Sequence, residues 1–170
     1  KMKSGIFLFF LVGAIQLAAE GRTEHQQLAL DIFKELIETD TTHSTGDTGI
    51  AAQKMADRLL AAGFPADDVK VIINAPGKGN LVARFRSRAP VRRPVLFLAH
   101  LDVVEANPED WSFDPFTLRE DQGYFYGRGT LDDKDEAAIH IANFIWMKGH
   151  GYSPDRDIIV ALTADEEGGS

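Results

Sequence analysis

The chain has 170 residues, of which 44% are hydrophobic and 26% are charged. This is the composition of an ordinary globular domain, and it excludes a disordered chain, a collagen repeat and a disulfide-rich scaffold. Because the chain has no cysteine, it also has no thiolate nucleophile and no cysteine zinc ligand. A net charge of −8 argues against general nucleic-acid binding.

The N-terminal segment has the pattern of a secretory signal peptide. Lys1 and Lys3 precede an apolar run over 5–19, and small residues follow it. The run is shorter than the about 20 apolar residues that a membrane-spanning helix needs. The sequence therefore predicts a signal peptide over 1–21 and a secreted or periplasmic protein, with an uncleaved membrane anchor as the alternative.

Two amphipathic helices are expected next. Apolar residues recur at helical spacing over 24–38, and Thr23 is placed to cap the start of this helix. A second helix is expected over 48–62, with Gly63 as its end. Its inward-facing side chains are expected to be the following apolar residues: Ile50, Met55, Leu59 and Leu60.

The middle of the chain is rich in strand patterns. Strands are expected over 69–73 and 81–85, separated by a turn over 75–79. The apolar run over 94–99 has no polar interruption, which predicts a central strand buried on both faces.

A hairpin, a helix and a strand are expected in the last third of the chain. The hairpin joins 117–120 to 124–126, the helix covers 133–148 and the strand covers 157–163. Helices that alternate with buried strands predict an α/β fold with a mostly parallel core sheet.

The negative charge is concentrated beyond residue 100. Residues 101–170 hold 5 lysines and arginines but 16 aspartates and glutamates. A segment of this kind repels itself unless something positive offsets it. It indicates either a solvated acidic face or a site for divalent cations.

Three short polar segments favour the cation site. They are His100-Leu101-Asp102 after one strand, Gly127-Arg128-Gly129-Thr130-Leu131-Asp132-Asp133-Lys134 at a helix start, and Asp165-Glu166-Glu167-Gly168-Gly169 after the last strand. Alone, each has a plain structural explanation: a structural histidine, an acidic helix start or a solvated turn. Together they supply one imidazole and several carboxylates at strand ends, where α/β proteins bind ligands.

In order and spacing, these segments resemble the co-catalytic zinc amidohydrolases and exopeptidases. This is the family of carboxypeptidase G, aminoacylase, carnosinase, acetylornithine deacetylase and succinyl-diaminopimelate desuccinylase. The resemblance implies a three-layer α/β sandwich with a mixed, mostly parallel central sheet. Residues 22–170 would be the N-terminal part of its di-zinc catalytic domain, truncated at the C-terminus. The rest of that domain, its remaining metal ligands and a lid or dimerisation domain would lie beyond residue 170.

The resemblance also implies a role for each matched residue. His100 would bind one zinc, Asp132 would bridge both zincs and Glu167 would bind the other. Glu166 would act as the general base and acid that activates the zinc-bridging water, and Asp102 would orient His100. In this family the peptide bond after the bridging aspartate is often cis.

The expected function is hydrolysis of a C–N amide bond, as in a metallopeptidase or an N-acyl amino-acid amidohydrolase. The complete site would hold two Zn²⁺, or Co²⁺ or Mn²⁺ in their place, and the substrate would be a small peptide or an N-acyl amino acid. No nucleic-acid partner is expected, and a homodimer would form through the missing domain. The alternative is a non-catalytic metal- or peptide-binding relative of the same fold, which would be expected to lack ligands or the catalytic glutamate.

Overall fold

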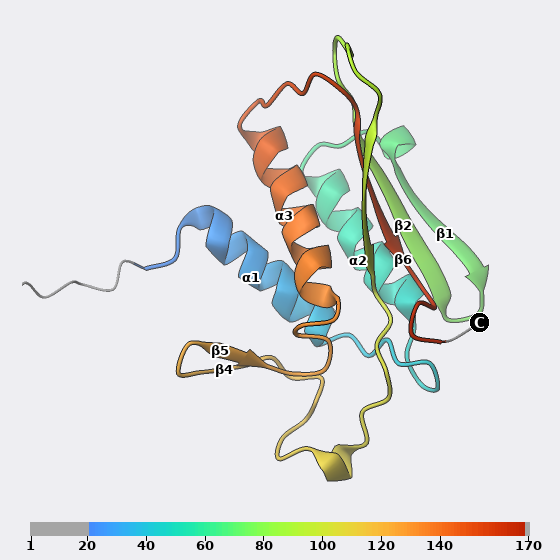
Figure 1. Ribbon diagram of the computed structural model, residues 1–170, viewed down its shortest axis with the longest axis vertical. Coiled ribbons are helices and arrows are strands. Elements are labelled where there is room, and N and C mark those ends of the chain that lie inside the picture. Colours follow the sequence, from blue (N-terminus) through green and yellow to red (C-terminus); the bar gives the residue numbers. More distant parts are fainter. Residues whose placement is uncertain (1–20, 169–170) are drawn as a thin grey trace, which may run out of the picture.

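The computed structural model describes residues 21–168 (Figure 1). The predicted signal peptide and the alternative anchor therefore fall outside the described residues, apart from Gly21. Among residues 21–168, no helix combines the length and the hydropathy needed to cross a membrane.

Three long helices form close to their expected positions. They are α1 (Glu24–Ile37), α2 (Thr48–Ala61) and α3 (Lys134–Gly149). Thr23 caps α1 as predicted: its hydroxyl accepts a hydrogen bond from the Gln26 N–H, and the Gln26 side chain accepts one from the Thr23 N–H. This reciprocal pair satisfies two N–H groups that have no partner within the helix.

The inner face of α2 differs from the prediction. Met55 and Leu59 are fully buried as expected, but Ile50 is 52% exposed and Leu60 is 40% exposed. The buried face includes Ala51, Met55 and Leu59, spaced by four residues, and Ile50 lies one position, about 100°, away from it. Leu60 follows buried Ala56 at the same spacing, but it lies next to the last residue of α2 and stays partly exposed. The prediction for these two side chains is wrong.

The main sheet has the strand order β1-β2-β6-β3. The strands are β1 (Val69–Ala75), β2 (Lys78–Phe85), β3 (Val95–His100) and β6 (Ile158–Thr163). Strand β3 runs parallel to β6, whereas the β1–β2 and β2–β6 pairs are antiparallel. The α/β class and the mixed sheet are confirmed, but within residues 21–168 the sheet is not mostly parallel.

Short elements complete the described fold. A separate hairpin, close to the predicted one, pairs β4 (Arg119–Asp121) with β5 (Tyr124–Tyr126). Two 3₁₀ turns are also present: η1 (Ala66–Asp68) lies between α2 and β1, and η2 (Pro108–Asp110) lies between β3 and β4.

Strand β3 lies at an edge of the sheet, not at its centre. Leu96 is 53% exposed and Leu98 is 59% exposed, so the prediction of a strand buried on both faces is wrong for the described residues. An uninterrupted apolar run predicts that a strand is buried, but it does not specify which strands pair with it. Here β6 occupies the interior position next to β3, and β3 lies at the edge. The three long helices lie on one side of the sheet (Figure 1), so the described part has two layers where three were expected.

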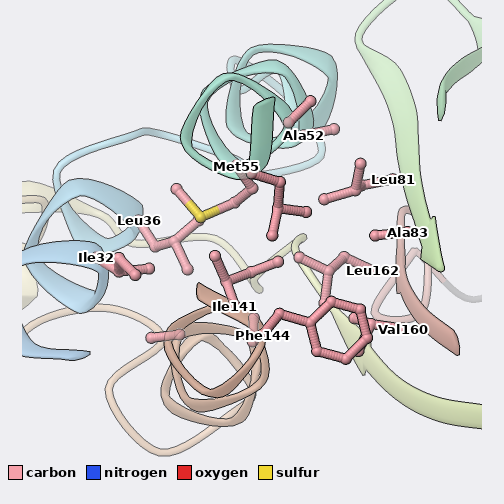
Figure 2. Packing of buried hydrophobic residues seen from close by; sticks show 14 of the residues in the cluster. Ile32, Leu36, Ala52, Met55, Leu81, Ala83, Ile141, Phe144, Val160 and Leu162 are labelled. Atoms are coloured by element: carbon pink, nitrogen blue, oxygen red, sulfur yellow. The ribbon is translucent and has the colours of Figure 1, made fainter. Parts of the chain in front are cut away.

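The hydrophobic core fills the space between the helices and the sheet (Figure 2). Fully buried side chains from both layers meet there, among them Leu36, Met55, Leu81, Ile141 and Leu162. Their packing fixes β6 between β2 and β3. The carboxyl ends of the parallel strands β3 and β6 therefore lie side by side.

Candidate metal centre

The candidate site forms where β3 and β6 end. His100 is the last residue of β3 and pairs with Thr163, the last residue of β6. The backbone N–H of His100 donates to Asp133 Oδ2 at 3.0 Å. This bond attaches the segment before α3 to the ends of both strands, so the three polar segments singled out from the sequence converge.

The three expected metal ligands lie together. His100, Asp132 and Glu167 each offer one ligand atom, and these atoms all lie within 4.8 Å of one another. The His100 Nε2 atom is 2.9 Å from Asp132 Oδ1 and 3.8 Å from Glu166 Oε2. One imidazole with carboxylates is a donor set that suits Zn²⁺. The residues present therefore fit a divalent ion of this kind.

The His100 ring is held from behind by the main chain. Its Nδ1 atom lies 2.9 Å from the carbonyl oxygen of Asp102 and 3.7 Å from Asp102 Oδ1. If the proton is on Nδ1, it is donated to this carbonyl and Nε2 is available as a ligand, as in many metal-binding histidines. Burial alone lowers the pKa of His100, but the Asp102 carbonyl and the carboxylate of Asp132 outweigh it and raise the pKa.

The Asp102 carboxylate reaches the neighbouring strand end. It is buried, and it accepts hydrogen bonds from the N–H of Glu166 at 3.1 Å and the N–H of Glu167 at 2.8 Å. The expectation from the family was that Asp102 orients His100. In the structure its carbonyl contacts that ring, and its carboxylate holds the turn that carries both glutamates.

Two carboxyl groups of the site, those of Glu167 and Asp133, have a raised pKa. Burial, followed by the negative charge of Asp132, raises the pKa of Glu167. Burial also raises the pKa of Asp133. A cation at the convergence point would offset this repulsion.

Lys134 is a residue whose role the sequence analysis missed. Its side chain is fully buried, and its Nζ donates to the carbonyl oxygens of Leu36 at 2.9 Å and Thr39 at 2.8 Å, at the C-terminal end of α1. Burial lowers the pKa of Lys134 to about 7. A cation in the first turn of a helix is unfavourable for the helix dipole. That position was the available signal that Lys134 serves a partner elsewhere.

Gly129 makes room for this lysine. Its φ is +86°, and a Cβ atom at this position would lie 2.8 Å from Val103 Cγ1 and 3.0 Å from Lys134 Cδ. Only glycine fits this backbone conformation without strain. The Asp132–Asp133 peptide bond is cis, as the family resemblance implied.

Known proteins of one family match this chain. Residues 96–170 match the model of Peptidase family M20/M25/M40. Over 152 residues the chain is 32% identical to an N-fatty-acyl-amino acid synthase/hydrolase of Danio rerio, a match that covers 85% of this chain and 29% of that protein. It is 34% identical over 159 residues to a succinyl-diaminopimelate desuccinylase of Psychrobacter sp., covering 87% of this chain and 37% of the relative.

The fold comparison agrees with the sequence comparison. The crystal structure of human carnosine dipeptidase 1 matches with a TM-score of 0.70 and 24% identity, covering 86% of this chain and 33% of that one. The resemblance inferred from the motifs is confirmed: residues 96–170 match the Peptidase family M20/M25/M40 model, and the chain is similar to these two relatives along most of its length. It spans between 29% and 37% of the length of these relatives.

Proposed function

We propose that the protein containing this chain hydrolyses a C–N amide bond with the help of two zinc ions. The observation that carries this proposal is the convergence of His100, Asp132 and Glu167 within 4.8 Å, with the Glu166 carboxylate beside them. The relatives named for N-acyl amino acids and for a dipeptide support a small peptide or an N-acyl amino acid as the substrate. Co²⁺ or Mn²⁺ in place of zinc would suit the same donors.

The residues would divide the work as follows. His100, Asp132 and Glu167 would hold the metal. When bound, zinc supplies Lewis-acid polarisation of the scissile carbonyl and lowers the pKa of water. Glu166, whose side chain is 62% exposed, would take a proton from the attacking water. As the C–O bond forms and the C–N bond breaks, Glu166 would pass this proton to the leaving amine.

The two adjacent glutamates provide the test, because substituting each of them should have a different effect. In the zinc-loaded protein that contains this chain with the rest of its catalytic domain, Glu166→Ala should keep its zinc content. It should nevertheless lower kcat by about 10²–10⁴-fold, the usual contribution of a general acid–base group. Glu167→Ala should lose zinc first and activity as a consequence.

Zinc content measured by atomic emission and turnover of an N-acyl amino-acid and dipeptide panel would give both readouts. Glu109→Ala, at an exposed glutamate in η2, is the matched control and should change neither. Normal turnover of Glu166→Ala, or equal loss of zinc from both site variants, would contradict the assigned roles. An intact protein that binds zinc but hydrolyses no amide would be a non-catalytic relative.

Export and dimerisation are further parts of the proposal. The charge and hydropathy pattern of residues 1–21 supports a signal peptide. A mature N-terminus near residue 20 or 22, found by mass spectrometry on protein outside the cytoplasm, would support export, and an intact N-terminus on a cytoplasmic protein would contradict it. A homodimer would form through a part of the protein outside this chain.

A further inference from the structure

The turn that carries Glu166 and Glu167 is also held by β2, which the mechanism above does not use. Antiparallel pairing of β2 with β6 places Leu81 opposite Leu162, and the ladder stops there. Beyond that point, β2 contacts the turn after β6 through its side chains and not through its main chain. Asn80 Oδ1 accepts a hydrogen bond from the Ala164 N–H at 2.9 Å.

Lys78 makes the second of these contacts. Continued past its last pair, the β2–β6 register would bring Lys78 opposite Asp165. There the Lys78 Nζ donates to Asp165 Oδ1 at 2.7 Å and lies 3.0 Å from His43 Nδ1. The Lys78 side chain is 20% exposed and the Asp165 side chain is 39% exposed, so this ion pair is partly accessible to water.

Asp165 has an unusual backbone conformation, and it immediately precedes the two glutamates. Its φ is +71°, in the left-handed region that residues other than glycine seldom adopt. Its carboxylate folds over the turn closely enough that a Cβ atom on Gly168 would overlap with Asp165 Oδ1. The conformation of Asp165 therefore sets the direction in which Glu166 and Glu167 leave β6.

The main chain on both sides of Lys78 is held by hydrogen bonds to Thr48. The carbonyl of Gly77 accepts hydrogen bonds from the N–H of Thr48 at 3.0 Å and from its hydroxyl at 3.1 Å. The Gly79 N–H donates to the same hydroxyl at 2.9 Å, and Thr48 is buried. Both neighbours of Lys78 are thus attached to the N-terminus of α2, so its main chain has little freedom to move.

We propose that Lys78 is a positioning residue for the candidate active site. Its ammonium group holds Asp165 in the left-handed conformation and so fixes the turn that presents Glu166 and Glu167 toward His100. This inference rests on the proposed function, because the two glutamates matter only if they bind metal and move protons. Lys78 has no contact with His100, Asp132 or Glu167 among the hydrogen bonds and ion pairs of the described residues.

A positioning role predicts a specific pattern of effects. Lys78→Met keeps the aliphatic stem but removes the ammonium group, so the turn should become mobile while every metal ligand and Glu166 remain. In the zinc-loaded protein, kcat should fall by about 10–10²-fold, the cost of a small misplacement of a catalytic group. KM should change little, because Lys78 is not placed to touch substrate. Lys78→Arg should restore most of the turnover.

Two measurements do not depend on activity. Amide hydrogen exchange of residues 164–168 should be faster in Lys78→Met than in the unsubstituted protein, and the zinc affinity measured by chelator competition should fall by about tenfold because Glu167 is less well placed. The control is Lys70→Met on β1, where the lysine is 57% exposed and lies 3.7 Å from Asp67. This control should match the unsubstituted protein in every measurement.

The outcomes separate this inference from the proposed function. If the unsubstituted protein binds zinc and hydrolyses amides, but Lys78→Met leaves kcat and the exchange of residues 164–168 unchanged, the positioning role is wrong. If the unsubstituted protein shows no zinc binding and no hydrolysis, the proposed function fails. Should Lys78→Met fold poorly, Asp165→Asn removes the same ion pair from the other side, and an equal effect on exchange and kcat would support the role. No effect of Asp165→Asn would overturn it.

Discussion

Asp102 connects the ends of two strands through one side chain and one carbonyl. Its carboxylate accepts hydrogen bonds from the N–H groups of Glu166 and Glu167, and its carbonyl oxygen lies 2.9 Å from His100 Nδ1. Asp102 is 2% exposed, so water has little access to its side of these contacts. A buried N–H group without a partner costs about 1–3 kcal/mol.

We therefore expect Asp102→Asn to destabilise the protein by about 1–3 kcal/mol. Asparagine keeps the shape of aspartate, but its NH₂ group cannot accept a hydrogen bond, so either Glu166 or Glu167 loses its N–H partner. Urea unfolding would measure the change in the free energy of unfolding. The control is Asp31→Asn on the exposed face of α1, where the change should stay within about 0.5 kcal/mol. Equal values for the two variants would show that the two hydrogen bonds of Asp102 contribute nothing.

At this scale, the sequence predicted which residues converge at the candidate site better than it predicted the residues that support them. His100, Asp132 and Glu167 could be recognised because each lies in a short segment whose spacing is characteristic of a family. Lys78 and Lys134 could not be assigned in this way, because their partners lie 87 and at least 95 residues away. Only the register of β2 with β6 and the packing of α1 against α3 bring these partners together.

The start of β6 is anchored to β2 by an ion pair between Asp157, which is buried, and Arg84, which is 40% exposed. Asp157, which precedes β6, is 7% exposed. Its Oδ2 accepts a hydrogen bond from Arg84 Nε at 2.9 Å, and its Oδ1 accepts one from the Ser87 N–H at 2.7 Å. The Arg84 hydrogen bond, followed by that from Ser87, lowers the pKa of Asp157 below its ordinary value of 3.8.

This lowered pKa predicts an acid-dependent loss of stability. Folding favours the ionised carboxylate, so the stabilisation is fully present above the unfolded-state pKa of about 4 and is lost as the pH falls through the folded-state pKa. Asp157→Asn should lower the free energy of unfolding at neutral pH, and it should make that energy less sensitive to pH below about 4. Urea unfolding at several pH values would measure both effects.

The control for this prediction is Asp67→Asn, at a side chain that is 94% exposed. It should leave the pH dependence unchanged. If Asp157→Asn showed the same pH profile as the unsubstituted protein, the ion pair would not be the source of the acid sensitivity.

Helices were predicted more accurately than strands for a physical reason. The start of α1 depends on a local signal, the cap at Thr23, which the sequence displays directly. In the structure Asp47 caps α2 in the same way, because its side chain accepts hydrogen bonds from the N–H groups of Gly49 and Ile50. The position of β3 in the sheet depends on which strand pairs with it, and that partner, β6, lies about sixty residues further along the chain. Apolar character alone did not distinguish an edge strand from a central one.

For the molecule as a whole, the helices cover only one face of the main sheet. Substitutions on that face should therefore lower the free energy of unfolding more than substitutions on the other face. The helices pack against one face, where Leu162 of β6 is fully buried, whereas Leu98 of the edge strand β3 is 59% exposed. Leucine is a core residue by type at both positions. Only its place in the fold distinguishes the two.

Leu162→Ala should therefore destabilise this 170-residue chain by about 2–5 kcal/mol, through lost burial and the cavity that it leaves. Leu98→Ala removes the same atoms from a side chain that is already in contact with water, and it should cost less than about 1 kcal/mol. Urea unfolding of the two variants, compared at equal protein concentration, measures the difference. If Leu98→Ala lowered the free energy of unfolding as much as Leu162→Ala does, the Leu98 side chain would have to be buried in solution. The exposed surface of β3 would then be contradicted.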